Sequence, residues 1–254
     1  MKFSKKLSAL AVASALSVPA VMVAAPAQAE LSGNIGVVSQ YVLRGIGQEN
    51  DRAAIQGGID YANDSGFYLG WWGSSLGYNY NAPGSDAYTA QGFENDIYGG
   101  FAGSVGGIDY NIGLLQYYYL NVDDSDLTEL VLGAGYGPFS AQAQYLLNDG
   151  LWGNAGDTYW TFNYGTDLPS DFTLDVSLGY YTYNDDDAGN DKGGPDWIAT
   201  TESSAFRHLN FTLSHPIGDT GADMGITYII AGDNRGGVST DDTMTMNISY
   251  GFGL

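Results

Sequence analysis

Between residues 32 and 61 the chain alternates apolar and polar positions in two runs that a polar loop separates. The apolar side carries Ile35, Val37, Tyr41 and Leu43 in the first run, and Ala53, Ile55, Ile59 and Tyr61 in the second. The polar side carries Gly36, Gln40 and Arg44, then Gln56, Gly58 and Asp60. Because successive strand side chains point to opposite faces, this pattern predicts two strands, each with one apolar and one polar face.

The same unit recurs along the rest of the chain and predicts about twelve strands, each near the ~10 residues of a tilted membrane strand. The clearest alternation places Phe172, Leu174, Val176, Leu178 and Tyr180 on one face. Short turns, such as residues 63–66 and 104–107, alternate with longer loops, such as residues 76–93 and 184–203. A fourth strand is expected at residues 94–103. Bacterial outer-membrane barrels show this alternation of short periplasmic turns and long outer loops.

No stretch after residue 29 reaches the 18 or so apolar residues of a membrane-spanning helix. The composition includes 20 Tyr, 10 Phe, 5 Trp and 37 Gly, which suits strands with aromatic girdles. The sequence therefore predicts an all-β protein, an antiparallel transmembrane β-barrel of about twelve strands with periplasmic termini. Since eight strands make a filled barrel and sixteen leave an open channel, twelve favour a narrow pore.

Residues 1–29 have the pattern of a cleaved signal peptide, and residues 30–254 form the predicted barrel. Lys2, Lys5 and Lys6 make a basic start, residues 7–23 are apolar or small, and Ala27-Gln28-Ala29 is a cleavage box. A transmembrane anchor is the alternative, but Ser and Ala interrupt the apolar run.

Cleavage leaves five basic residues against all 29 acidic ones, so the net charge moves from −21 to −24. That balance excludes nucleic acid as a partner, and the absence of cysteine excludes a disulfide framework.

Residues 39–48 read SQYVLRGIGQ, and residues 66–75 read GFYLGWWGSS. Together with the strand at residues 56–61, these stretches resemble the TorF-type porins, a proteobacterial family of exported proteins. Ser39, Tyr41, Arg44 and Gly45 match the opening motif of that family, and Glu94 and Asp96 match its acidic pair. The resemblance covers essentially the whole mature chain and implies a porin-like role.

Arg44 is the first candidate for a functional residue, because it lies on the polar face near the outer end of the first strand. Its planar guanidinium suits a carboxylate, so we expect it to pair with Glu94 or Asp96, or to hold an anionic solute.

Four aspartates fall on the polar face, each near a short turn: Asp60, Asp109, Asp175 and Asp223. They form either a periplasmic ring that favours cations or a set of solvated residues beside the turns. The predicted pore lining is Gln40, Arg44, Gln56, Asp60, Glu94, Asp96, Asp109, Glu129, Asp175 and Asp223.

We predict neither a metal, nor a cofactor, nor an enzymatic activity. The acidic group Asp185, Asp186, Asp187, Asn190 and Asp191 offers oxygen ligands for a hard cation, but its spacing differs from the EF-hand loop and favours a solvated loop. A hydrolase site is conceivable around His208 with Ser204 and Asn210, or around His215 with Ser214. No G-x-S-x-G elbow is present to expose a serine.

The sequence therefore predicts an outer-membrane porin for passive diffusion of small polar or cationic solutes through an acidic lumen. Its partners would be outer-membrane lipid, lipopolysaccharide and the barrel-assembly machinery. The alternative is a closed barrel that acts as a surface-binding or adhesion protein through its outer loops. Inward rings favour that alternative, namely Tyr68, Trp72, Tyr117, Tyr119 and Tyr181. A soluble periplasmic β-sandwich is a third possibility, for which the strands are too long and too numerous.

Overall fold

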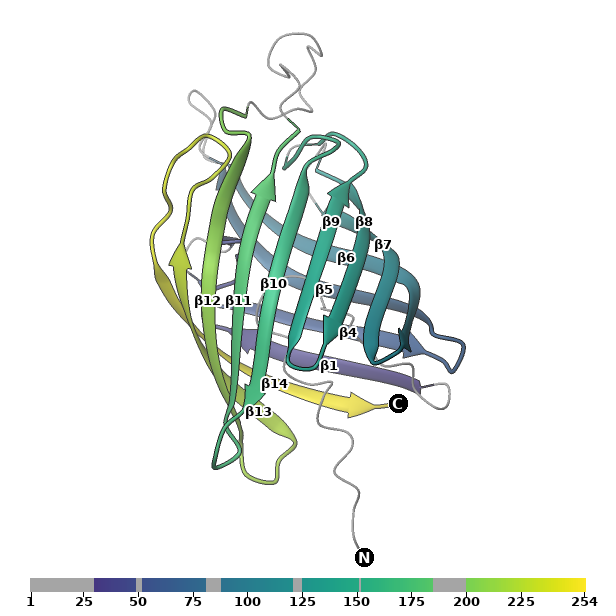
Figure 1. The fold of residues 1–254 in the computed structure, drawn as a ribbon. Coiled ribbons are helices and arrows are strands. Elements are labelled where there is room, and N and C mark those ends of the chain that lie inside the picture. The colour runs from purple at the N-terminus through teal and green to yellow at the C-terminus, as the bar shows by residue number, and fades with distance from the viewer. Residues whose placement is uncertain (1–29, 49–51, 81–87, 121–124, 151, 185–199) are drawn as a thin grey trace, which may run out of the picture.

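The computed structural model describes residues 30–48, 52–80, 88–120, 125–150, 152–184 and 200–254. Twelve of its strands close into a barrel (Figure 1). They are β1 (Glu30–Val38), β4 (Ala54–Ala62), β5 (Phe67–Tyr80), β6 (Tyr88–Val105), β7 (Ile108–Leu120), β8 (Leu127–Tyr136), β9 (Phe139–Leu146), β10 (Thr158–Asp167), β11 (Thr173–Thr182), β12 (Ser204–Pro216), β13 (Ala222–Ala231) and β14 (Thr243–Gly253). Two short strands, β2 (Val42–Leu43) and β3 (Ile46–Gly47), form a separate hairpin.

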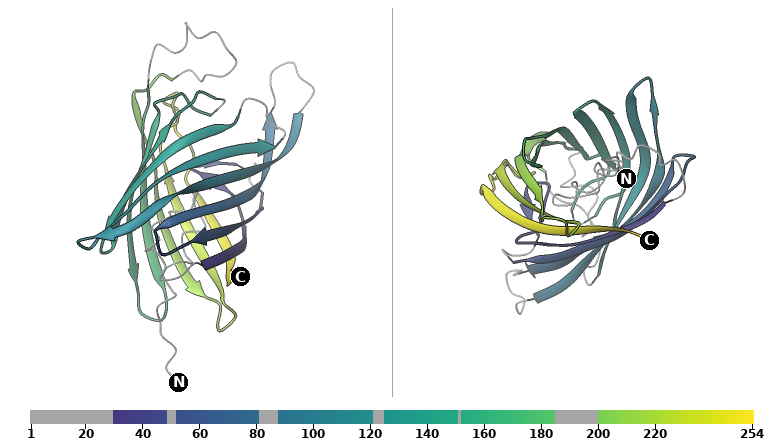
Figure 2. Two further views of the ribbon diagram at one scale, coloured as in Figure 1. Left: turned by 90° about the vertical axis from the view of Figure 1, so that its right-hand side faces the viewer. Right: turned by 90° about the horizontal axis from the view of Figure 1, so that it is seen from below.

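Every barrel strand pairs antiparallel with its neighbours, and β1 closes the ring on β14, from Ser32 opposite Gly253 to Val38 opposite Asn247. Seen from the end that carries the short turns, the strands follow one another around a ring (Figure 2). Closure satisfies the backbone of every strand, which is the requirement for a sheet in lipid. The predicted twelve-stranded antiparallel barrel is confirmed.

The barrel is apolar outside and polar inside. Ile35 and Ile97 are 54% and 53% exposed on the outer surface, whereas Glu94 on the other face of β6 is fully buried. The same exposed apolar positions recur on every strand pair, and such a continuous apolar surface is suited to lipid rather than water. No helix in the described part of the chain is long and apolar enough to cross a membrane.

The short turns and the C-terminus lie at one end of the barrel, and the loops that join β9 to β10 and β13 to β14 lie at the other (Figure 1). Gly66, in the turn between β4 and β5, has φ +86°. A Cβ atom there would clash with the backbone oxygen of Ala102 on β6. Glycine is therefore required at this turn, both for its left-handed conformation and for its lack of a side chain.

The predicted loop at residues 76–93 is wrong. The strands β5 and β6 continue to pair as far as Tyr80 opposite Tyr88, so only residues 81–87 connect them. Lipid contact requires apolar side chains at every second position of a strand, whereas the backbone hydrogen bonds between strands also form outside the membrane. Strands that extend beyond the membrane therefore lose the pattern and keep the pairing.

The first strand also ends earlier than its pattern predicts. β1 stops at Val38, and residues 39–48, which we call the inner segment, turn into the lumen and carry the β2–β3 hairpin. Tyr41 and Val42 are only 1% and 3% exposed. Placing Tyr41 and Leu43 on the lipid face is therefore wrong. The predicted signal peptide (residues 1–29) and the acidic group from Asp185 to Asp191 lie outside the described residues.

Candidate functional site

The inner segment is held against the barrel wall on the side of β5 and β6. The Tyr41 hydroxyl donates a hydrogen bond to Glu94 Oε1 at 3.2 Å. The Tyr41 ring also contacts Trp72 edge to face, with 5.7 Å between centroids. At the hairpin turn, Arg44 and Gly45 adopt positive φ values of 51° and 80°, which reverse the chain and direct the Arg44 side chain across the lumen.

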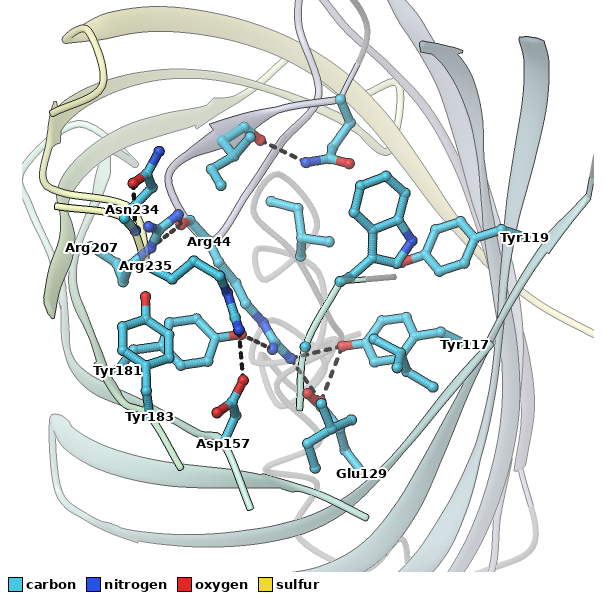
Figure 3. A pocket seen from close by; sticks show the side chains of 18 of the residues that line it. Arg44, Tyr117, Tyr119, Glu129, Asp157, Tyr181, Tyr183, Arg207, Asn234 and Arg235 are labelled. Carbon is cyan, nitrogen blue, oxygen red and sulfur yellow. Dashed lines mark hydrogen bonds and ion pairs between the residues drawn. The ribbon is translucent and has the colours of Figure 1, made fainter. Parts of the chain in front are cut away.

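Arg44 connects the inner segment to the opposite walls (Figure 3). Its Nη2 atom donates to Glu129 Oε2 at 2.7 Å and to the Tyr117 hydroxyl at 2.9 Å, while Nη1 donates to the Tyr181 hydroxyl. Its Cζ atom lies 4.5 Å from the centroid of the Tyr159 ring, a cation–π distance. The ion-pair partner is therefore Glu129 on β8 and not Glu94 or Asp96, because the inner segment carries the guanidinium past β6.

Around Arg44, the lumen has a cavity of about 470 Å³ near the long loops. Two stacked tyrosine pairs contribute to its walls, one formed by Tyr117 and Tyr119 and one by Tyr181 and Tyr183. Burial raises the pKa of Tyr183 to about 12, so this phenol is neutral at pH 7. The Arg235 Cζ atom lies 4.9 Å from its ring centroid. The cavity thus combines aromatic faces with cationic groups.

Three of the four arginines among the described residues line this cavity: Arg44, Arg207 and Arg235. Arg235 forms an ion pair with Asp157, with 2.5 Å between Nη2 and Oδ2. Within the described ranges, Arg207 instead donates to backbone oxygens alone, from Nε and Nη2 to Arg44 and from Nη1 to Asp233. Among the described residues it has no carboxylate partner.

Arg207 and Arg235 were not predicted as site residues. By the alternation of β12, Arg207 should face lipid with Leu209. A β-bulge changes this, because Gly179 pairs with His208 and Tyr180 pairs with Phe206, which leaves Arg207 as the extra residue. A bulge turns side chains away from their regular direction, and Arg207 accordingly points inward with 3% exposure. The only sequence signal is the rarity of arginine in an acidic chain.

The other predicted lining residues lie on the inner face, but in different places. Glu94 and Asp96 are fully buried beside the inner segment, and Glu94 Oε2 and both Asp96 carboxylate oxygens lack a hydrogen-bond partner within the described ranges. Gln56 donates to Ser74 Oγ at 3.3 Å on the neighbouring strand. Gln40, at the start of the inner segment, accepts a hydrogen bond from Thr243 Oγ1 at 3.2 Å. Arg44 and Glu129 are the only two of the predicted residues that line the cavity itself.

The four predicted aspartates lie far from this cavity, toward the short turns. Asp60, Asp109, Asp175 and Asp223 are half-buried and belong to four different strands, β4, β7, β11 and β13. Asp60 accepts a hydrogen bond from the Tyr98 hydroxyl. The aspartates are thus distributed around the barrel, and the selectivity expected of them stays a prediction.

The serines proposed for a hydrolase do not lie beside a histidine that they could use. His208 Nε2 is 2.5 Å from the Tyr159 hydroxyl. Ser204 is four strand residues away, about 13 Å along the strand, and its Oγ accepts from Tyr180. Ser214 and His215 are consecutive strand residues, so their side chains point to opposite faces.

A family model described as a bacterial protein of unknown function (Gcw_chp) matches residues 23–253. The chain belongs to this family. A search of curated proteins gives no match, and the likeness to TorF-type porins stays a resemblance in sequence.

Solved structures share the barrel. The KdgM porin matches with a TM-score of 0.51 and 11% identity over 87% of this chain and 99% of its own. The structure of the KdgM porin in complex with disordered oligogalacturonate gives the same values. The NanC porin matches with a TM-score of 0.48 and 11% identity over 86% of this chain and 97% of its own. At these identities the likeness to KdgM shows a common fold.

Proposed function

We propose that the protein is an outer-membrane channel for passive diffusion of small polar solutes. The observation that carries the proposal is a closed barrel with an apolar outer face and a charged cavity inside its lumen. A lumen completely filled by side chains would not leave a cavity of about 470 Å³. The fold shared with the KdgM porin supports the proposal.

The inner segment determines what can pass. It contacts β5 and β6 through Tyr41 and reaches β7, β8 and β11 through Arg44. It therefore crosses the lumen, and a solute must pass beside it. We expect a narrow pore that admits molecules of about one sugar ring and excludes longer chains unless they enter end-on.

Two groups of charges act on a solute along the path. Near the long loops it meets the arginines of the cavity, and near the short turns it meets Asp60, Asp109, Asp175 and Asp223. Because a ring of carboxylates concentrates cations, we propose a net preference for small cations at the periplasmic mouth. Export by the signal peptide, insertion by the barrel-assembly machinery and contact with lipopolysaccharide belong to the same proposal.

The second candidate is a closed barrel whose outer loops bind a surface. It is favoured by the large rings that occupy the lumen, since Tyr68, Trp72, Tyr117 and Tyr119 are all buried. In that case the inner segment is a permanent plug.

Single-channel recording separates the two candidates. The mature chain is folded in detergent, checked by its heat-modifiable mobility, and reconstituted in a planar bilayer with a salt gradient. A channel gives discrete current steps with a reversal potential on the cation side. A correctly folded barrel that conducts no ions would disprove the channel and support the plugged barrel.

A further inference from the structure

We propose that Arg207 and the cavity around it form a binding site for a small organic monoanion, a carboxylate carried on a compact ring. The proposal names a class of ligand for the proposed channel and rests on that channel function, because the ligand must enter from the end of the barrel with the long loops. Four observations support it: the hydrogen-bond pattern of Arg207, the charge balance of the cavity, its size and its aromatic walls.

Arg207 is a buried cation with free capacity to donate. A guanidinium has five N–H groups, two of them on each terminal nitrogen. Arg207 uses its Nε–H and one hydrogen on each terminal nitrogen to bind backbone oxygens. One N–H on Nη1 and one on Nη2 therefore have no acceptor among the described residues. Two N–H groups on neighbouring nitrogens are what a carboxylate accepts in bidentate geometry.

The charge balance of the cavity favours an anion. Among the described residues, its lining contains three arginines and two carboxylates, Glu129 and Asp157. Arg44 pairs with Glu129, and Arg235 pairs with Asp157. Within the part of the chain that the structure describes, Arg207 is left as the charge without a carboxylate partner, in a place only 3% exposed, where an unpaired ion is costly. Glu94 and Asp96 are not part of this lining.

One excess positive charge favours a monoanion. A carboxylate carries one negative charge at pH 7, whereas a phosphate monoester carries about −1.5 to −2. The cavity of about 470 Å³ accepts a compact ligand. The stacked pairs Tyr117–Tyr119 and Tyr181–Tyr183 come from β7 and from the end of β11, and they lie on opposite sides in Figure 3. Their ring faces suit the flat, apolar face of a small ring.

The β-bulge supports a functional role for this arginine. Without the bulge, residue 207 would point toward lipid, where an arginine is unfavourable. With it, the residue leaves the ladder and its guanidinium reaches the carbonyl of Arg44 in the inner segment. The bulge thus places the free N–H groups at the point where the inner segment narrows the lumen.

The test compares glucuronate with glucose, which has the same ring without the carboxylate. Binding to the folded barrel in detergent is measured by calorimetry. We expect glucuronate to bind and glucose to bind at least tenfold more weakly. Arg207→Gln should weaken glucuronate binding by about tenfold or more, since charge-assisted hydrogen bonds are lost. Arg52→Gln is the matched control, because Arg52 is exposed and outside the cavity, and it should bind like the parent.

Glu129→Gln provides a test in the opposite direction if Arg207→Gln does not fold. It removes one negative charge from the lining, and the glutamine oxygen can still accept the hydrogen bond from Arg44 Nη2, so the inner segment should stay in place and glucuronate should bind more tightly. Equal binding of glucuronate and glucose, or no tightening in Glu129→Gln, would overturn the site. Because binding is measured in detergent, its result is independent of conduction. Glucuronate binding without conductance would refute the channel alone, and conductance without glucuronate binding would refute the site alone.

Discussion

Replacing Arg44 by alanine should release the inner segment from the barrel wall and open the lumen. The substitution removes the 2.7 Å ion pair with Glu129, the hydrogen bonds to Tyr117 and Tyr181, and the cation–π contact with Tyr159. On the side of β5 and β6, the contacts of Tyr41 with Glu94 and Trp72 remain. The segment would thus lose its side-chain anchor on β7, β8 and β11, while the strands of the barrel stay paired and the hydrogen bonds from Arg207 to the Arg44 carbonyl and from Thr243 to Gln40 remain.

The size of the effect follows from the burial of the pair. The Glu129 side chain is 2% exposed and the Arg44 side chain is 12% exposed. Breaking a buried ion pair by removing one partner costs about 3–5 kcal/mol. Since every 1.4 kcal/mol is about a factor of ten in an equilibrium constant, the ratio of the inward to the released segment should fall by more than about a hundredfold.

Single-channel recording of Arg44→Ala measures this directly. We expect larger current steps and longer open times than in the parent protein, with unchanged heat-modifiable mobility. Arg52→Ala is the matched control and should reproduce the parent record. If folded Arg44→Ala gave the same distribution of step sizes and open times as the parent, Arg44 would not hold a restriction in the conducting path.

Three further substitutions test other parts of the account. Asp60→Asn should shift the reversal potential in a salt gradient toward zero, because one carboxylate leaves the periplasmic mouth; an unchanged potential would remove Asp60 from the conducting path. Ile97→Lys puts a charge on the lipid face in the middle of β6 and should lower the free energy of unfolding from vesicles by about 2–4 kcal/mol. This is measured by titration with guanidinium chloride, and an unchanged free energy of unfolding would argue against contact between Ile97 and lipid. Gly66→Ala should destabilise the barrel more than Gly106→Ala does. Both glycines have positive φ, so alanine at either position lowers the free energy of unfolding by about 1 kcal/mol through the backbone conformation. Of these two variants, only Gly66→Ala also clashes with Ala102. Equal losses of unfolding free energy in the same titration would contradict this reasoning.

The barrel and its two faces are predictable from the sequence because lipid imposes a period of two on every strand that crosses it. Ile97 and Glu94, three residues apart, fall on opposite faces as their pattern predicts. The inner segment is not predictable in this way. Its hairpin is also extended, so Tyr41 and Leu43 continue the alternation of β1 although the chain has left the wall. A one-dimensional pattern cannot distinguish a strand in the wall from an extended segment in the lumen.

The candidate site is only partly predictable, for a related reason. Arg44 was identified because it lies on a polar face, but its partner Glu129 is distant in sequence and is brought near only by the reversal at Gly45. Arg207 follows the period of the lipid face, and the bulge opposite Gly179 and Tyr180 turns it inward. A bulge adds one residue without leaving a recognisable composition, so every position beyond it is assigned to the wrong face.

Solute permeation into liposomes tests the central claim most directly. Liposomes that contain the folded parent protein are placed in isotonic solutions of uncharged sugars of increasing size, and the rate of swelling is followed by light scattering. The account predicts that monosaccharides cause swelling faster than in protein-free liposomes and that the rate falls steeply for di- and trisaccharides. Swelling no faster than in protein-free liposomes for every sugar would contradict the channel and leave a plugged barrel.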